Sequence, residues 1–208
     1  MKKLIIPTQV KCDRKVKERR QQLIEAAKTL FLEKGFHKTT TRDISRTANL
    51  SFGAIYEYIQ SKEDILYLLI EDFYDHLDEM LTTSHLDNYQ GASRLYTFIN
   101  IYFRAMDQYS DEIKIIYRDL QSLPAVYIDY VLSKEKELIK FVTKMIGKTY
   151  VEEKIEICEG YISMMARNLI VQGHMWAFRS WDLKDTLSLK EYIDVQSTFL
   201  INAIQDNN

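Results

Sequence analysis

Residues 39–64, "TTTRDISRTANLSFGAIYEYIQSKED", contain three helix starts in quick succession. Thr41, Ser51 and Ser61 belong to the residue types that cap helix N-termini, and acidic residues follow the first and the last of them within one turn. Between the first two helices, Asn49 tolerates the left-handed backbone conformation of a tight turn. Two short helices joined by a three-residue turn form a helix-turn-helix motif. The stretch therefore predicts this motif, with a third helix directly behind it.

A longer helix is predicted in front of the motif, in "RKVKERRQQLIEAAKTLFLEKG". Its apolar residues follow the spacing of three and four that places them on one face, and Gly35 ends it. These residues are Leu23, Ala26, Ala27, Leu30 and Phe31. Apolar residues of the motif would pack on this face, namely Ile44, Ala48, Leu50, Ile55 and Ile59.

The rest of the chain also predicts helices. Six Gly and two Pro in 208 residues favour long helices over a turn-rich β fold. We expect helices at about 62–83, 91–109, 111–122, 124–147, 151–180 and 188–206. The predicted fold class is all-α, with an N-terminal three-helix helix-turn-helix domain at 1–62 and a C-terminal helical domain at 63–208.

The net charge of −2 conceals an uneven distribution. Residues 1–62 carry 14 Lys and Arg against 6 Asp and Glu, a balance of +8, whereas residues 63–208 carry 14 against 24, a balance of −10. A basic first third suggests that this part alone binds a polyanion. The alternative is an ordinary fluctuation of charge along the chain. The size of the change at a predicted domain boundary favours a partner.

Cysteine content and hydrophobic runs indicate the compartment. Cys12 and Cys158 lie far apart in the chain, which favours a reducing compartment over a disulfide framework. The apolar run before Pro7 is too short for a signal peptide, and no stretch approaches the roughly 18 apolar residues of a membrane span. We expect a cytoplasmic protein without a membrane partner.

The predicted motif suggests how the basic part would bind DNA. The N-terminal residues of the second helix of such a motif enter the major groove, and here that helix is predicted from Phe52 to Ile59. Residues 51–54 are mostly small, so the backbone could approach the base edges. Tyr56 and Tyr58 lie about 200° apart around a helix and could donate to phosphates on either side. The alternative, that both tyrosines only cover the core, is equally open.

Residues 23–66, "LIEAAKTLFLEKGFHKTTTRDISRTANLSFGAIYEYIQSKEDIL", resemble the DNA-binding domain of tetracycline-repressor-type (TetR) transcriptional regulators. The resemblance rests on the combination of AA-x3-F, a Gly with an aromatic residue at 35–36, a Thr pair, S-x-G-x-I-Y-x-Y at 51–58 and Ser-Lys-Glu at 61–63. Asn49 and Ile59 depart from the family pattern, which mostly has Gly and Phe there.

This resemblance implies a set of DNA contacts, with a double-stranded DNA operator as the partner. The contact residues would be Thr41, Arg42, Ser51, Phe52, Gly53, Ala54, Tyr56, Glu57, Tyr58 and Lys62. Phe52 and Glu57 occupy positions that vary in the family and set specificity. The carboxylate of Glu57 could accept from cytosine N4 or only repel phosphate, which leaves the operator sequence open.

The predicted helix at 151–180 is apolar on two faces. A helix that is apolar nearly all round is buried on both sides, and a second subunit would cover the second face. The resemblance implies the same, because the last two helices of the family usually form a four-helix dimer interface. Candidate interface residues are Met164, Val171, Met175, Tyr192, Phe199, Leu200 and Ala203. A fully internal helix in a monomer is the alternative.

The middle helices are rich in aromatic residues and methionine. Apolar walls with a few polar groups are typical of ligand pockets, and the resemblance implies that this region encloses an effector. Candidate pocket residues are Phe103, Tyr117, Arg118, Tyr127, Met165, Asn168, Gln172 and Trp176. Ordinary core packing, or a paired or solvated polar group, is the alternative for each of them. Analogy suggests an apolar or amphipathic effector such as an acyl thioester.

Motifs of catalysis or metal binding are not evident. The four histidines are scattered, and HExxH, CxxC, GxGxxG, GxxxxGK[ST] and GxSxG are absent from the sequence. We therefore expect no enzyme, no catalytic residue, no cofactor and no metal site. The sequence predicts a dimeric DNA-binding transcriptional regulator, a repressor that a small effector releases from its operator. The alternatives are a helical ligand carrier or scaffold without DNA binding, or an uncharacterised helical enzyme.

Overall fold

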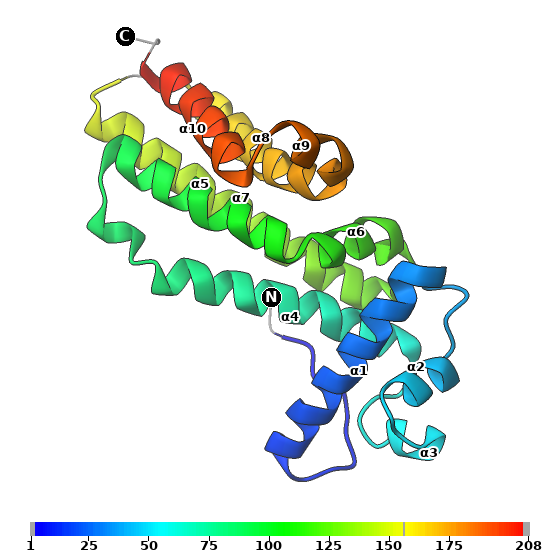
Figure 1. Ribbon diagram of the computed structural model, residues 1–208. Helices are drawn as coiled ribbons and strands as arrows, with labels where there is room; N and C mark the ends of the chain where they lie inside the picture. The colour runs from blue at the N-terminus through cyan, green and yellow to red at the C-terminus, as the bar shows by residue number, and fades with distance from the viewer. Residues whose placement is uncertain (1–2, 156, 206–208) are drawn as a thin grey trace. The chain divides into compact units, whose positions relative to one another are not determined.

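The computed structural model describes residues 3–155 and 157–205 of the chain (Figure 1). Within these residues every regular element is a helix, so the all-α prediction is confirmed. The α-helices are α1 (Asp13–Lys34), α2 (Thr41–Thr47), α3 (Phe52–Ile55), α4 (Lys62–Thr83), α5 (Gly91–Gln108), α6 (Ser110–Asp119), α7 (Ala125–Glu152), α8 (Glu159–Phe178), α9 (Ser180–Thr186) and α10 (Leu189–Gln205). Two short 3-10 helices are η1 (Leu86–Asn88) and η2 (Leu120–Ser122). In this part of the chain no helix combines the length and the apolar character that a membrane crossing requires.

The predicted helix boundaries agree well in the first half of the chain and shift in the second. α4 spans the predicted residues 62–83, and α5 begins at the predicted residue 91. The helix predicted at 151–180 is divided, because α7 continues to Glu152 and α8 begins only at Glu159. Lys154 between them has a φ of +58°, a left-handed conformation that is incompatible with a continuous helix.

Contacts divide the chain into two compact units. Unit 1 comprises the chain up to Tyr74 together with Lys114–Ser133, and unit 2 comprises Asp75–Ile113 and the chain from Lys134 onward. This division differs from the boundary predicted between residues 62 and 63. Residues 65–70, in the first turns of α4, are buried and belong to unit 1, whereas α4 from Asp75 onward belongs to unit 2. The sequence also did not indicate that parts of α6 and α7 belong to unit 1.

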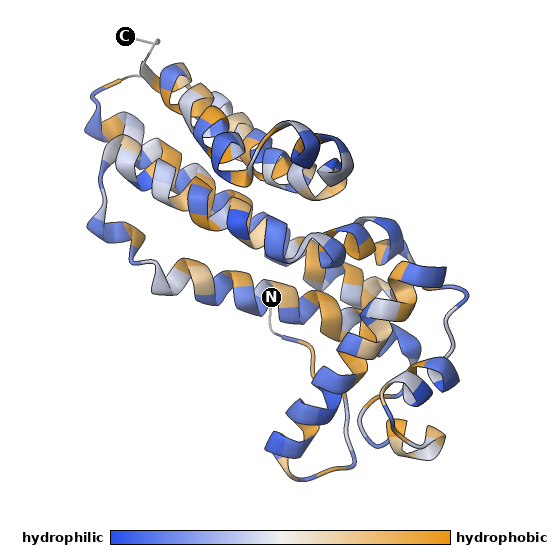
Figure 2. Ribbon diagram, in the orientation of Figure 1, coloured by the Kyte–Doolittle hydropathy of each residue, from blue (hydrophilic) through white to orange (hydrophobic). Residues whose placement is uncertain are grey.

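Unit 1 is built around α1. The apolar side chains predicted to face its core are buried, among them Leu23, Ala27 and Phe31. Ile44 of α2 and Ile55 of α3 are fully buried as predicted, and each such side chain contributes about 1.5–3 kcal/mol to folding. In Figure 2, hydrophilic residues predominate in the first turns of α1 and hydrophobic residues in its middle. The hydrophobic middle of α1 therefore packs against α2, while its polar first turns carry basic side chains.

Unit 2 packs α5 against α8 and α10. Phe103 of α5, Trp176 of α8 and Tyr192 of α10 are buried together. The ring centroid of Tyr192 lies 5.1 Å from that of Trp176 and 5.5 Å from that of Phe103. Ring pairs at such distances contribute about 0.5–1.5 kcal/mol beyond their burial. This aromatic cluster joins the three helices at the centre of the unit.

A buried tyrosine and histidine fix the approach of α5 to α8. The hydroxyl oxygen of Tyr102 lies 3.0 Å from Nε2 of His174 and donates to the carbonyl oxygen of Ile170 at 3.3 Å. Burial lowers the pKa of His174 to about 4, so the imidazole is neutral at pH 7. Gly173 faces the tyrosine ring, and a Cβ atom there would lie 2.5 Å from Cε1 of Tyr102. The close contact of the two helices therefore requires glycine at position 173.

Replacing Gly173 by alanine should destabilise the protein by about 1–3 kcal/mol, the usual cost of overpacking a core. Gly147→Ala is the matched control, because Gly147 also lies inside a helix and its added Cβ would meet Cδ1 of Ile162 at an ordinary 3.8 Å. The control should gain about 0.5–1 kcal/mol from the better helix propensity of alanine. Urea unfolding followed by circular dichroism measures both variants. Equal stability of the two would contradict the packing argument.

Candidate nucleic-acid interface

The helix-turn-helix is formed by α2, a turn at residues 48–50, and α3. The N-cap of α2 is Thr40, one residue before the predicted Thr41, and its hydroxyl accepts from the N–H of Asp43. Asn49 has the predicted left-handed conformation, with a φ of +53°, and the N–H of Leu50 donates to the carbonyl of Ser45 at 2.8 Å. Ser51 caps α3 as predicted, because its Oγ accepts from the N–H of Ala54.

The second helix of the motif is shorter than predicted. It ends at Ile55, whereas the sequence predicted a helix to Ile59. After it, the N–H groups of residues 56–58 bond to carbonyls three residues earlier. The carbonyl oxygen of Tyr58 accepts from Nε and Nη2 of Arg20 at 3.1 and 3.0 Å, so a side chain of α1 binds the backbone just after α3. A contact between residues distant in the chain therefore holds the segment that follows α3.

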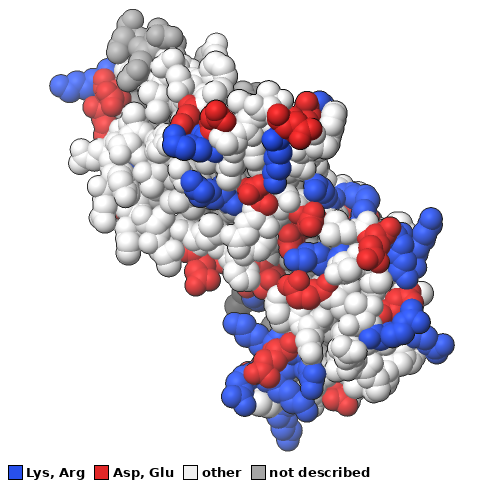
Figure 3. Space-filling model, viewed as in Figure 1, with Lys and Arg blue, Asp and Glu red and all other residues white. Residues whose placement is uncertain are grey.

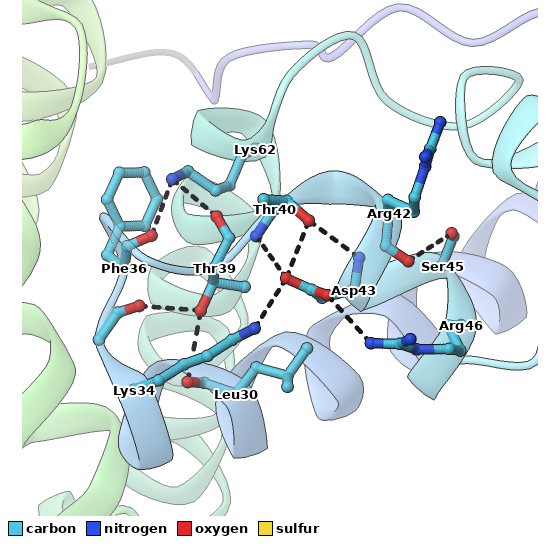
Figure 4. A network of polar contacts seen from close by, with 11 residues as sticks. Leu30, Lys34, Phe36, Thr39, Thr40, Arg42, Asp43, Ser45, Arg46 and Lys62 are labelled. Carbon is cyan, nitrogen blue, oxygen red and sulfur yellow. Dashed lines mark hydrogen bonds and ion pairs between the residues drawn. The ribbon is translucent and has the colours of Figure 1, made fainter.

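A carboxylate joins the end of α1 to the start of α2 (Figure 4). Oδ2 of Asp43 accepts from Nζ of Lys34 at 2.7 Å and from both the N–H and the hydroxyl of Thr40. Its Oδ1 accepts from Nη2 of Arg46 at 3.1 Å. Hydrogen bonding to Lys34, and then to Thr40, lowers the pKa of Asp43 far below its ordinary value. The network holds α2 in place and leaves the neighbouring Arg42 exposed.

Lys62 has an internal role that the sequence did not predict. Its Nζ donates to the carbonyl oxygens of Phe36 at 2.7 Å and Thr39 at 3.0 Å, and it lies 4.0 Å from the centroid of the Phe36 ring (Figure 4). Burial lowers the pKa of Lys62. Lys62 was predicted as a phosphate contact, and in the structure its ammonium holds the segment between α1 and α2.

The structure separates the remaining predicted DNA contacts by exposure. Arg42, Ser51, Phe52, Gly53, Tyr56 and Glu57 are exposed, and Thr41 and Ala54 are partly exposed. Tyr58 is only 3% exposed, so its prediction as a phosphate contact is corrected to a core position. Tyr56 is 40% exposed, and its hydroxyl lies 3.2 Å from Oγ1 of Thr41. Tyr58 therefore takes the core alternative that the sequence left open, whereas Tyr56 stays a predicted contact.

An N-terminal segment before α1 lies against the motif. Ile6 is buried, and its carbonyl accepts from Nη2 of Arg20 at 2.7 Å. The carbonyl oxygen of Glu57, just after α3, accepts from the N–H of Gln9 at 3.0 Å and the hydroxyl of Thr8 at 2.8 Å. This support was not predicted from the sequence, although the apolar run before Pro7 was a signal for it.

Basic residues surround this part of unit 1. In Figure 3, Lys and Arg side chains gather over α1 and α2, with some acidic side chains between them. This agrees with the balance of +8 in residues 1–62. The motif therefore lies in a basic surface, which is the electrostatic condition for binding a phosphate backbone.

Three predicted pocket residues belong to unit 1 and make contacts there. Tyr117 is exposed, and Nη2 of Arg118 donates to Asp119 and to the carbonyl of Phe31 at the end of α1. Tyr127 donates to Oδ1 of Asp64 at 2.7 Å. These bonds are internal to unit 1, so for Arg118 and Tyr127 the structure shows roles in joining α6 and α7 to the DNA-binding helices.

The other five predicted pocket residues belong to unit 2. Phe103 and Trp176 lie in the aromatic core, and Nε1 of Trp176 donates to Asp107 at 2.8 Å. Met165 and Gln172 are half-buried and Asn168 is exposed. A cavity of about 10 Å³ in unit 2 is lined by Ala92, Leu95, Thr149, Glu153, Ile201 and Ile204. It has room for about one water molecule and contains none of the predicted residues.

The predicted interface residues also divide by exposure. Met164, Val171, Met175, Phe199 and Ala203 are exposed, and Tyr161 and Val195 extend this apolar face of α8 and α10. Tyr192 and Leu200 are buried within the subunit, and the hydroxyl of Tyr192 donates to the carbonyl of Gln172 at 2.8 Å. These two predictions are corrected, because the core of unit 2 occupies that side of α10.

Comparisons of sequence agree with this geometry. Residues 23–67 match the family model described as bacterial regulatory proteins, tetR family. The HTH-type transcriptional regulator HbdR of Aromatoleum sp. (strain CIB) is 28% identical over 86% of this chain and 77% of that protein. The biofilm operon icaADBC HTH-type negative transcriptional regulator IcaR of Staphylococcus aureus is 25% identical over 82% of this chain and 86% of that protein.

Comparison of structures shows a shared fold. AibR, solved in complex with isovaleryl coenzyme A and operator DNA, superimposes with a TM-score of 0.74 at 17% sequence identity. The superposition covers 88% of this chain and 98% of AibR. The matched family model, the relatives and the helix-turn-helix geometry of residues 40–59 lead to one conclusion. This chain is a DNA-binding transcriptional regulator of the TetR family.

Proposed function

We propose that the protein is a dimeric repressor that a small apolar or amphipathic effector releases from its operator. The observation that carries the DNA-binding part is the exposed surface of Arg42, Phe52 and Tyr56, which lies beside a capped turn in a basic region. Repression is supported by the relative IcaR, which is a negative transcriptional regulator. The sign of regulation in this chain is inferred from that likeness.

Operator binding would use the exposed residues and not the buried ones. Arg42 can donate to phosphate, and the exposed ring of Tyr56 places a hydroxyl donor next to Thr41. Tyr58 and Lys62 serve the fold, since they hold the end of the motif and the segment before α2. The contact surface is therefore narrower than the resemblance implied.

Arg42→Ala and Lys62→Ala should consequently behave differently. Loss of the exposed Arg42 should leave the melting temperature unchanged, weaken operator binding and reduce the salt slope by about one. Loss of Lys62 should lower the melting temperature, because two carbonyls lose a charged donor worth about 1.5–3 kcal/mol. Thermal melting and fluorescence anisotropy at several salt concentrations measure both effects. A Lys62→Ala variant with normal melting and a reduced salt slope would instead show a phosphate contact.

Dimerisation would cover the exposed apolar face of α8 and α10. Phe199 is 65% exposed, and Tyr161, Met164 and Val171 are also more than half exposed. Such a set of large apolar side chains on adjacent helices is typical of a subunit interface. A symmetric dimer would supply two recognition helices for the two half-sites of an operator.

Phe199→Glu should dissociate the dimer while each subunit stays folded. The matched variant Leu200→Ala removes a neighbouring side chain that is buried inside the subunit, so it should lower stability by about 2–4 kcal/mol and leave a dimer. Sedimentation velocity and circular dichroism distinguish the two results. Wild-type protein that sediments as a monomer at micromolar concentration would rule out the proposed assembly.

The effector proposal rests on likeness and on the composition of the middle helices. The structural neighbour AibR was solved with isovaleryl coenzyme A, which makes short acyl thioesters the first compounds to test. Within unit 1, Arg118 bonds to the last turn of α1 and Tyr127 to the first turn of α4. A shift of α6 or α7 on effector binding would therefore move the helices that carry the motif.

Arg118→Ala tests this coupling. In the wild type, binding of an acyl-coenzyme A should lower the affinity of the protein for its operator. Operator DNA should lower the affinity of the protein for the acyl-coenzyme A by the same factor, typically about 5–150-fold. In Arg118→Ala that factor should approach one. The affinity for the acyl-coenzyme A, measured in the absence of DNA, should be unchanged. Arg104→Ala, on the exposed side of α5, is the control. Loss of affinity for the compound, with coupling intact, would place Arg118 in the pocket as the sequence predicted.

A further inference from the structure

The exposed part of the recognition helix is apolar. Phe52, Gly53 and Ala54 form its first three positions, and Figure 2 colours α3 orange and white. The hydroxyl of Ser51, just before them, accepts the capping hydrogen bond from the N–H of Ala54. Arginine, lysine, asparagine and glutamine read guanine and adenine through paired hydrogen bonds, and none of these residue types occurs between residues 51 and 59.

The ring of Phe52 is exposed but held in one orientation. It is 41% exposed, although a large apolar side chain is normally buried. Cζ of Arg42 lies 5.0 Å from its ring centroid, on the ring face. The ring of Tyr56 meets it edge-on, with centroids 5.4 Å apart and an interplanar angle of 89°. The bond between the Tyr56 hydroxyl and Thr41 in turn fixes the tyrosine.

The space beside Phe52 is open. A Cβ atom built on Gly53 would have no neighbour within 4 Å. Another molecule can therefore approach the backbone of α3 next to the ring. Phe52 contributes its apolar surface to that approach without first losing much conformational freedom, because Arg42 and Tyr56 already restrict its rotation.

In the major groove, one base-pair group matches such a surface. The C5-methyl group of thymine is the apolar group that DNA presents there, and side chains such as phenylalanine contact it. Given the operator binding proposed above, we propose that Phe52 is a specificity-determining residue that recognises the methyl group of a thymine in each operator half-site. Arg42 and Tyr56 are positioning residues for this contact.

The test uses a duplex that the wild-type protein selects from a random-sequence pool. Each thymine of both half-sites is replaced in turn by deoxyuridine, which lacks only the methyl group. At one or two positions the wild type should lose affinity about fourfold per half-site, the value expected for one buried methyl group. Phe52→Ala should bind the thymine duplex more weakly by a similar factor and should not distinguish uracil from thymine at those positions.

Controls separate this contact from folding and from general binding. Phe52→Leu keeps an apolar surface and should retain part of the preference for thymine. Both variants should melt as the wild type does, because the side chain is exposed. A wild type that is indifferent to every uracil replacement would overturn the inference and leave the proposed DNA binding standing. So would a Phe52→Ala variant that keeps the full preference. Failure of the wild type to select any duplex would overturn the proposed DNA binding itself.

Discussion

Two oppositely charged side chains in the first turn of α4 hold the DNA-binding helices together. The buried carboxylate of Asp64 accepts from the N–H groups of Gln60 and Ser61 at 2.7 and 3.1 Å and from the hydroxyl of Tyr127 at 2.7 Å. Lys62, two residues earlier, binds the carbonyls of the segment between α1 and α2. A short segment connects α3 to the start of α4, so the position of the recognition helix depends on the bonds of both Lys62 and Asp64. Leaving either charge without its partners would be costly, because Asp64 is buried and Lys62 is partly buried.

This constraint explains which side chains remain available for DNA. Lys62 and Tyr58, which the family pattern offers as contacts, are used to hold the motif, and Arg20 binds the backbone behind it. The N-terminal segment adds a second support through its bonds to Glu57. Three side chains make no comparable bonds to the backbone of the motif and lie on the surface, namely Arg42, Phe52 and Tyr56. The exposed rings of Phe52 and Tyr56 suit the proposed contact with a thymine methyl group.

The second unit obeys a different constraint, since α8 and α10 are apolar on two sides. One side forms the aromatic core around Trp176 and Tyr192, where burial also keeps His174 neutral. The other side exposes Met164 and Phe199 to solvent in the single chain. Burying each such side chain would contribute about 1.5–3 kcal/mol. The same helices can therefore stabilise the subunit and supply an interface for a second one.

The sequence by itself determined the all-α fold, the helix-turn-helix, its left-handed Asn49 and its caps at Ser51 and Ser61, because periodicity and capping are local properties. It could not decide which of two faces of a helix packs inward, and for that reason Tyr58, Tyr192 and Leu200 were assigned to surfaces although they are buried. Nor could it predict that Lys62 bonds to two distant carbonyls, or that Arg20 bonds to the carbonyl of Tyr58. These features depend on contacts between residues far apart in the chain, and only the tertiary structure brings those residues together.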